Sequence, residues 1–79
     1  MKPGLVDLLA ESAKHQRTEK NISKERVADA LGKSVDSIRR FENGGSFVGL
    51  SEILAAYDTA GVSLIDLLDE ARSNLKKSG

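Results

Sequence analysis

The side chains best suited to bind another molecule are two adjacent arginines, Arg39 and Arg40. A guanidinium group donates two parallel N–H bonds, and this fork matches the O6 and N7 atoms of guanine or two oxygens of a phosphate. An adjacent arginine pair in an arbitrary chain is more often a solvated helix face. Here the pair stands on a short predicted helix that follows a Gly-x-Ser turn at 32–34, and this position favours the binding interpretation.

Groups for catalysis or metal binding are sparse in this sequence. The chain has one histidine, His15, and no cysteine. Transition-metal sites gather several His, Cys, Asp or Glu ligands, and a Gly-x-Ser-x-Gly nucleophile motif is absent from the sequence. We therefore expect no enzymatic activity, no metal and no cofactor, and we interpret His15 as a solvated residue.

The arginines must be positioned by two short helices joined by a tight turn. Ser23 is a typical N-cap, worth about 1 kcal/mol, and Ile22 can pack on Val27 as a hydrophobic staple. Gly32 predicts the end of the first helix, because glycine adopts the left-handed conformation without strain. Ser34 is expected to cap the next helix. The predicted helices cover 24–31 and 35–43.

Apolar spacing decides which side of the second short helix faces outward. Ile38 and Phe41 are three residues apart, so they share one face that we expect to be buried. The opposite side carries Val35, Asp36, Ser37, Arg39 and Arg40.

Three further stretches with helical periodicity complete the chain. Pro3 suits the first turn of a helix over about 3–20, and Asn21 tolerates the left-handed conformation after its end. The other two helices are predicted at about 50–60 and 64–76. Because no stretch alternates like a strand, the sequence predicts an all-α fold of five helices in a single domain, 1–79.

Charge is balanced overall but divided unevenly along the chain. Twelve Lys and Arg residues oppose twelve Asp and Glu residues. Residues 1–40 hold nine basic against six acidic side chains, and residues 41–79 hold three against six. Phosphate binding depends on Lys and Arg, so a basic first half gives weak support to a nucleic-acid partner. Without cysteine or an apolar run of about 20 residues, we expect a cytoplasmic protein that does not enter membranes.

A longer pattern runs from Ser23 to Leu68. Its members are Ser23, Ala28, Leu31, Gly32, Ser34, Ile38, Glu42, Asn43 and Gly44, then Gly61-Val62-Ser63 and Asp66-Leu67-Leu68. This pattern resembles that of the phage repressor and Cro-type (XRE-type) helix-turn-helix family. The resemblance implies a five-helix, lambda-repressor-like DNA-binding domain whose helix at 35–43 enters the major groove.

The resemblance and the outward face together suggest site residues. The candidates for base contacts are Val35, Asp36, Ser37, Arg39 and Arg40. The candidates for phosphate contacts are Lys24, Lys33, Ser34, Asn43 and Gly44. Arg17 aligns with a family arginine that bonds the glutamate ending the recognition helix, here Glu42, which implies a structural clamp.

Two departures from the family pattern shift this expectation. Val35 and Asp36 occupy sites where Gln, Ser or Arg often donate hydrogen bonds. Base readout should therefore depend mainly on Arg39 and Arg40, with Asp36 accepting from cytosine N4. Gln16 stands where an apolar residue is usual, which affects the packing of the first helix.

The last helix carries more apolar residues than four short helices can cover. We therefore take Leu68, Ala71 and Leu75 as candidates for a dimer interface, together with Phe47, which looks exposed in the connector at 46–49.

The sequence as a whole predicts a sequence-specific regulator of transcription that binds double-stranded DNA at a palindromic operator. Repression is the expected mode of action, in preference to activation. A homodimer is one expected assembly. The alternative is a protein-binding adaptor or antitoxin whose acidic C-terminal helix engages a partner protein.

Overall fold

The computed structural model describes residues 4–44 and 49–78, with side chains to residue 77. This part of the chain forms five helices and no strand, which confirms the expected all-α class. The helices are α1 (Leu5–Glu19), α2 (Lys24–Leu31), α3 (Val35–Glu42), α4 (Leu50–Ala60) and α5 (Leu64–Ser78). None of them is long and apolar enough to cross a membrane.

The helix ends lie within two residues of the predicted ones. The first helix begins at Leu5, with Gly4 as its N-cap; the residue expected to open it, Pro3, lies outside the described residues. Asn21 has a φ of 56°, the left-handed conformation predicted after this helix. Helix α5 continues to Ser78, two residues beyond the predicted end.

The two short helices are delimited largely by local chemistry. The Ser23 hydroxyl accepts a hydrogen bond from the Arg26 backbone N–H at 3.2 Å, as a capping serine should. Gly32 ends α2 with a φ of 78°. Ser34 occupies the N-cap position of α3, but its side chain accepts no capping hydrogen bond, so that part of the prediction was wrong.

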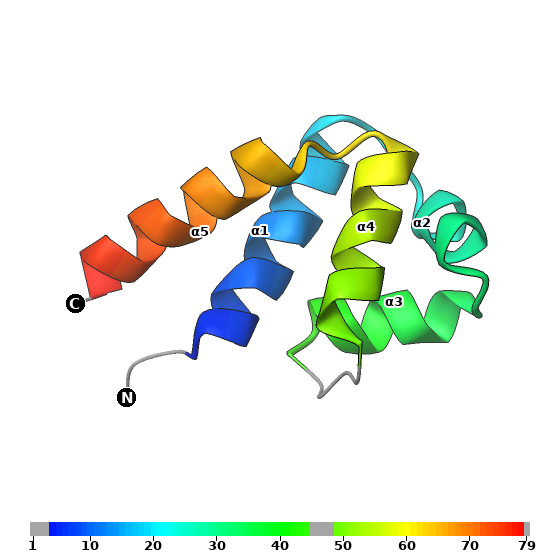
Figure 1. Ribbon diagram of the computed structural model, residues 1–79, viewed down its shortest axis with the longest axis horizontal. Coiled ribbons are helices and arrows are strands. Elements are labelled where there is room, and N and C mark those ends of the chain that lie inside the picture. Colours follow the sequence, from blue (N-terminus) through cyan, green and yellow to red (C-terminus); the bar gives the residue numbers. More distant parts are fainter. Residues whose placement is uncertain (1–3, 45–48, 79) are drawn as a thin grey trace.

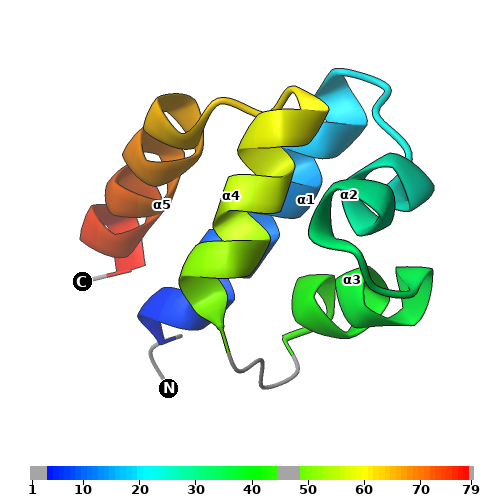
Figure 2. The same ribbon diagram turned by 45° about the vertical axis from the view of Figure 1, so that its right-hand side comes forward.

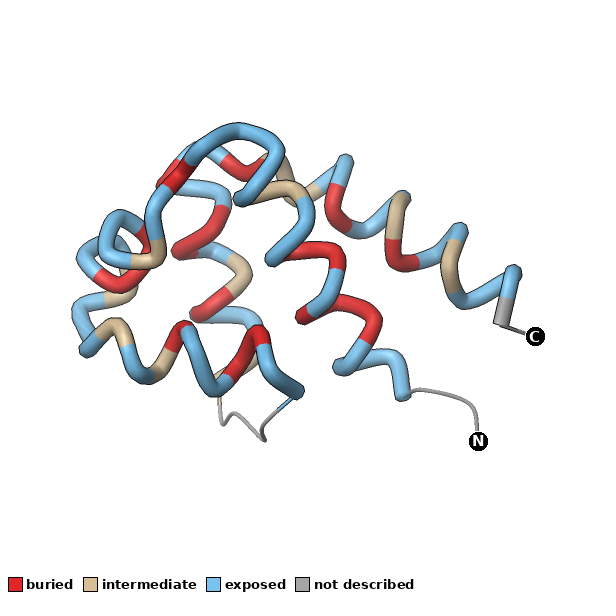
Figure 3. Tube along the Cα trace, turned by 180° about the vertical axis from the view of Figure 1, so that it is seen from behind, coloured by how far each residue is buried: buried red, intermediate tan, exposed pale blue. Residues whose placement is uncertain are grey.

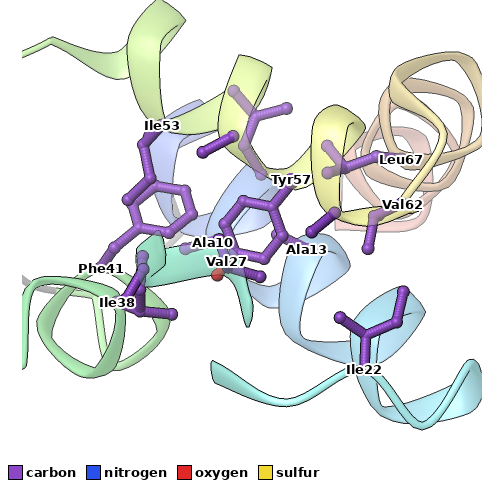
Figure 4. Packing of buried hydrophobic residues seen from close by; sticks show 14 of the residues in the cluster. Ala10, Ala13, Ile22, Val27, Ile38, Phe41, Ile53, Tyr57, Val62 and Leu67 are labelled. Atoms are coloured by element: carbon purple, nitrogen blue, oxygen red, sulfur yellow. The ribbon is translucent and has the colours of Figure 1, made fainter. Parts of the chain in front are cut away.

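The core lies where α1, α2, α3 and α4 converge. Val27, Ile38, Phe41, Ile53 and Tyr57 are completely buried there, and Figure 4 shows their side chains pointing toward one another. The rings of Phe41 and Tyr57 lie 5.9 Å apart at 50°. This tilted contact joins the inner face of α3 to α4 and so fixes which side of α3 faces outward.

The helices divide the molecule into two sides (Figure 1). Helix α2 packs on α4 and α3, whereas α5 packs mainly on α1. Turning the molecule shows the same separation, with α5 on one flank and the α2–α3 pair on the other (Figure 2). Helices α1 and α4 lie between these flanks and connect them.

Candidate nucleic-acid interface

Helix α3 presents a charged outer face and an apolar inner face. Ile38 and Phe41 are fully buried, while Asp36, Arg39 and Arg40 are exposed. This change between buried and exposed residues is visible along the helix in Figure 3. The inner residues anchor α3 in the core, so its polar side chains project into solvent where another molecule can reach them.

The two arginines of α3 differ in their surroundings. Arg39 Nη1 donates to Asp36 Oδ1 at 2.7 Å, and both side chains are more than half exposed. Over residues 4–44 and 49–78, Arg40 makes no ion pair or side-chain hydrogen bond. Its guanidinium donors are therefore available, whereas those of Arg39 are shared with a neighbouring carboxylate.

The first turn of α3 exposes fewer of its side chains than the sequence predicted. Val35 is half-buried and packs against the core, and Ser37 is also half-buried. Asp36 is the residue of this turn that extends most clearly into solvent, and it is bonded to Arg39. The exposed hydrogen-bond donors of α3 suited to base contact, Arg39 and Arg40, therefore lie in its second half.

Four of the five candidates for phosphate contact flank α3. Lys33 and Ser34 are exposed in the turn before it, and Asn43 and Gly44 are exposed after it. Lys24 is half-buried at the start of α2. The backbone N–H groups of Asn43 and Gly44 donate to the Arg39 and Phe41 carbonyls, so Asn43 offers its side-chain amide for phosphate contact.

One acidic residue near this surface was missed from the sequence. A Cβ built on Gly44 would lie 3.5 Å from Oδ1 of Asp7, which places the carboxylate of α1 beside the turn after α3. Asp7 also accepts a hydrogen bond from the Gly4 backbone N–H at 3.3 Å. Gly44 follows Asp7 by 37 positions in the chain, so no local sequence pattern could have revealed this proximity.

A buried polar cluster ties α3 to α1. Arg17 Nε donates to Glu42 Oε2 at 2.7 Å, and Nη2 donates to Oε1 at 3.0 Å. Arg17 Nη1 also donates to the Ile22 carbonyl at 2.9 Å. Arg17 and Glu42 are the two residues that the family resemblance paired. The bidentate geometry fixes the end of α3 relative to α1.

Helix α4 contributes a third member of this cluster. The buried Tyr57 hydroxyl donates to Glu42 Oε2 at 2.6 Å. Burial of the phenol, with the adjacent Glu42 carboxylate, raises the pKa of Tyr57 well above 10, so the hydroxyl stays a donor. The hydrogen bond to Glu42 likewise raises the pKa of Arg17. Because its carboxylate oxygens accept hydrogen bonds from Arg17 on α1 and Tyr57 on α4, the Glu42 side chain is held in one orientation.

The order and packing of α2 and α3 agree with a comparison to known families. The family model described as a helix-turn-helix domain matches residues 8–71, more than half of the chain. The chain belongs to the helix-turn-helix domain family. This membership indicates a DNA-binding regulator of a kind that is typically not enzymatic. No curated protein and no solved structure matched the chain.

The dimer candidates of this helix-turn-helix domain fall into different environments. Ala71 is 1% exposed and belongs to the core, so its assignment to an interface was wrong. Helix α5 packs mainly on α1, and the small alanine side chain is enclosed there. Leu68 and Leu75 are exposed, as is Ile65, which sequence reasoning did not select. Phe47 lies outside the described residues.

The single histidine of the helix-turn-helix domain makes a contact that the sequence did not reveal. His15 Nδ1 lies 2.8 Å from Glu70 Oε1 on α5, and Gln16 Nε2 donates to the same oxygen at 3.0 Å. His15 is otherwise exposed, as expected. Among the residues with described positions, no cluster of three or more His, Cys, Asp or Glu could hold a metal ion.

Proposed function

We propose that this helix-turn-helix domain is a sequence-specific regulator of transcription that inserts α3 into the major groove of double-stranded DNA. The observation that carries the proposal is the exposed guanidinium of Arg40, on the outer face of a helix whose inner face is fixed in the core. A rigid helix that offers free arginine donors is suited to contact guanine through O6 and N7.

The residues of α3 take distinct roles in this proposal. Arg40 reads a base directly. Arg39 is oriented by Asp36 at 2.7 Å, so it either reads a base with Asp36 as its support or contacts the groove wall. Asp36 can also accept from cytosine N4. Val35 and Ser37, being half-buried, contribute van der Waals contacts at the edge of the site.

Contacts to the DNA backbone surround this reading face. Lys24, Lys33, Ser34, Asn43 and Gly44 would bind phosphates and set the orientation of α3 without reading sequence. Asp7, beside Gly44, would repel phosphate and so limit the affinity at that end.

The proposal extends to the way in which the protein acts. It represses by occupying a palindromic operator in the cytoplasm, as a homodimer of the XRE type, with half-sites about 34 Å apart on one face of the DNA. No cofactor is required for this mode of binding. The order of the capped helices and the match to the helix-turn-helix domain support it.

The proposal is tested by selecting bound sequences from a random DNA pool. The enriched motif should show two-fold symmetry. Arg40→Ala should then lower the affinity for the selected site by about 1 to 3 kcal/mol and relax the preference at one position. Lys14→Ala is the control, because Lys14 is an exposed basic residue on α1 outside the proposed DNA-contact and dimer residues.

Two results would contradict the proposal. One is an Arg40→Ala variant that binds the selected site as tightly as the unmodified protein. The other is a pool without enrichment, together with elution from a heparin column at low salt. That second result would favour the adaptor hypothesis.

A further inference from the structure

The outer face of α3 contains an ion pair of its own. Arg39 Nη1 donates to Asp36 Oδ1 at 2.7 Å, and the two side chains are 55% and 59% exposed. Residues three positions apart on a helix are neighbours on its surface. An exposed pair of this kind adds little to folding stability. Its main physical effect is to restrict a long side chain that otherwise rotates freely.

The bond to Asp36 leaves one edge of the Arg39 guanidinium open. Arginine holds its five N–H donors in a planar fork. Within residues 4–44 and 49–78, the Nε and Nη2 atoms of Arg39 form no hydrogen bond. Two donors on one edge of a fork match O6 and N7 of guanine, whereas adenine has the N6 donor where guanine has O6. The open edge of Arg39 therefore suits guanine.

Arg40 stands on the same face of α3 without such a partner. Asp36 is three positions from Arg39 and four from Arg40, and its carboxylate bonds Arg39. Ordering a long, flexible side chain opposes binding. Arg40 must lose its freedom when it meets DNA, whereas Arg39 has already lost part of it. The two arginines are thus prepared differently for base contact.

We propose that Asp36 is a positioning residue that orients the Arg39 guanidinium toward a guanine. The Asp36–Arg39 pair then reads one G·C base pair as a unit, and Arg40 reads a second base independently. The inference rests on the proposed function, because it names a base and a specificity-determining residue within the same interface. It assigns Arg39 to a base edge and not to the groove wall.

The charge of Asp36 gives this arrangement a distinctive signature. A carboxylate on a DNA-facing helix repels the phosphates of every sequence. Asp36 should therefore lower the affinity for all DNA while it raises the selectivity for guanine. A residue that only stabilised the fold would shift both affinities in the same direction.

The first experiment asks whether Arg39 reads a base. Sequences bound by the full chain and by its Arg39→Lys variant are selected from the same random DNA pool. Lysine keeps the positive charge but has no planar fork. Arg39→Lys should therefore lower the preference for guanine at one position by about fivefold or more. The dependence of log K on log salt should stay the same, because the charge is kept.

The second experiment asks whether Asp36 acts on that same position. Fluorescence anisotropy gives the Kd for the selected duplex and for a duplex with this guanine replaced. Asp36→Ala should lower the ratio of the two Kd values by about two- to tenfold, because the arginine must now be ordered on binding. Binding to unrelated DNA should tighten slightly.

Asp29→Ala is the matched control for the second experiment. Asp29 is an exposed carboxylate on α2, and it forms no ion pair with a described residue. Its removal changes the net charge equally but should leave the ratio unchanged. Adding Asp36→Ala to Arg39→Lys should lower the ratio no further, because Asp36 acts through the guanidinium. Circular dichroism verifies that all variants keep their helices.

Three results would overturn this inference alone, while the pool still yields an enriched motif. One is an Arg39→Lys variant with an unchanged motif, which would assign Arg39 to phosphate. Another is an equal effect of Asp36→Ala and Asp29→Ala on the ratio. The third is a loss of selectivity from Asp36→Ala that persists in the Arg39→Lys chain, since Asp36 would then contact a base itself. A pool without enrichment would instead contradict the proposed function.

Discussion

Helix α1 is tied to both flanks of the molecule by ion pairs, and the two pairs differ in their exposure to water. Toward α3, Arg17 and Glu42 form a pair whose side chains are 11% and 1% exposed. Toward α5, His15 and Glu70 form a pair whose side chains are 56% and 22% exposed. The first pair holds the helix proposed to read DNA, and the second holds α5, which carries the exposed dimer candidates Leu68 and Leu75.

This difference indicates how firmly each flank is fixed. A buried charge that loses its partner cannot be compensated by water, so the Arg17–Glu42 pair strongly resists separation. An exposed pair is screened by solvent and contributes little. Helix α3 should therefore be positioned rigidly, while the orientation of α5 depends more on its apolar contacts with α1 and on solution conditions.

The largest expected effect comes from breaking the buried pair. Arg17→Ala would leave the Glu42 carboxylate with Tyr57 as its remaining side-chain donor. We expect the free energy of unfolding, measured by urea denaturation, to fall by about 3 to 5 kcal/mol.

Asp36→Ala is the matched control for this experiment. It removes the exposed ion pair with Arg39, and we expect a cost of about 0 to 1 kcal/mol. If the two variants lost the same stability, the contrast between buried and exposed pairs in this protein would be wrong.

An intermediate effect is expected from removing a phosphate contact on the α2–α3 flank. Lys24→Ala should weaken binding to all DNA sequences and reduce the slope of log K against log salt by about one unit, because one phosphate contact is lost. The readout is fluorescence anisotropy with labelled duplexes over a range of salt concentrations. Lys14→Ala, on α1, should leave the slope unchanged. An equal effect of both variants would mean that DNA is not confined to the α2–α3 flank.

The smallest effect concerns the exposed tie to α5. Hydrogen bonding and attraction to Glu70 raise the pKa of His15 above 6.5. Burial opposes ionisation of Glu70, but the hydrogen bonds from His15 and Gln16 outweigh it and lower the pKa of Glu70 below 4.5. The folded state thus favours protonated His15. On the His15 side, the stability gained from the contact is complete below pH 6.5 and is lost as the pH rises through the raised pKa of the folded state.

His15→Gln tests this dependence on pH. We compare the melting temperatures of the two proteins at a pH between 4.5 and 6.5 and at a pH well above 6.5. On going to the higher pH, the unmodified protein should lose slightly more melting temperature than the variant does. Parallel melting curves for the two proteins across this range would show that the His15–Glu70 contact has no influence on stability.

The amino-acid sequence determined the helices and the outward side of α3. Ser23 and Gly32 delimit α2 through hydrogen bonds and backbone angles set within a few residues. The spacing of Ile38 and Phe41 placed the arginines on the opposite face. These features were predictable because capping and helical periodicity depend on neighbours three or four positions away.

Tertiary structure decided which side chains meet across the fold. Tyr57 reaches Glu42, Glu70 reaches His15, and Asp7 lies beside Gly44, although none of these pairs is close in sequence. Only packing showed that Ala71 is enclosed while Ile65 is open to solvent on the same helix. An amphipathic pattern shows that a helix has an apolar side, but the angle at which it meets its neighbours decides how much of that side is covered.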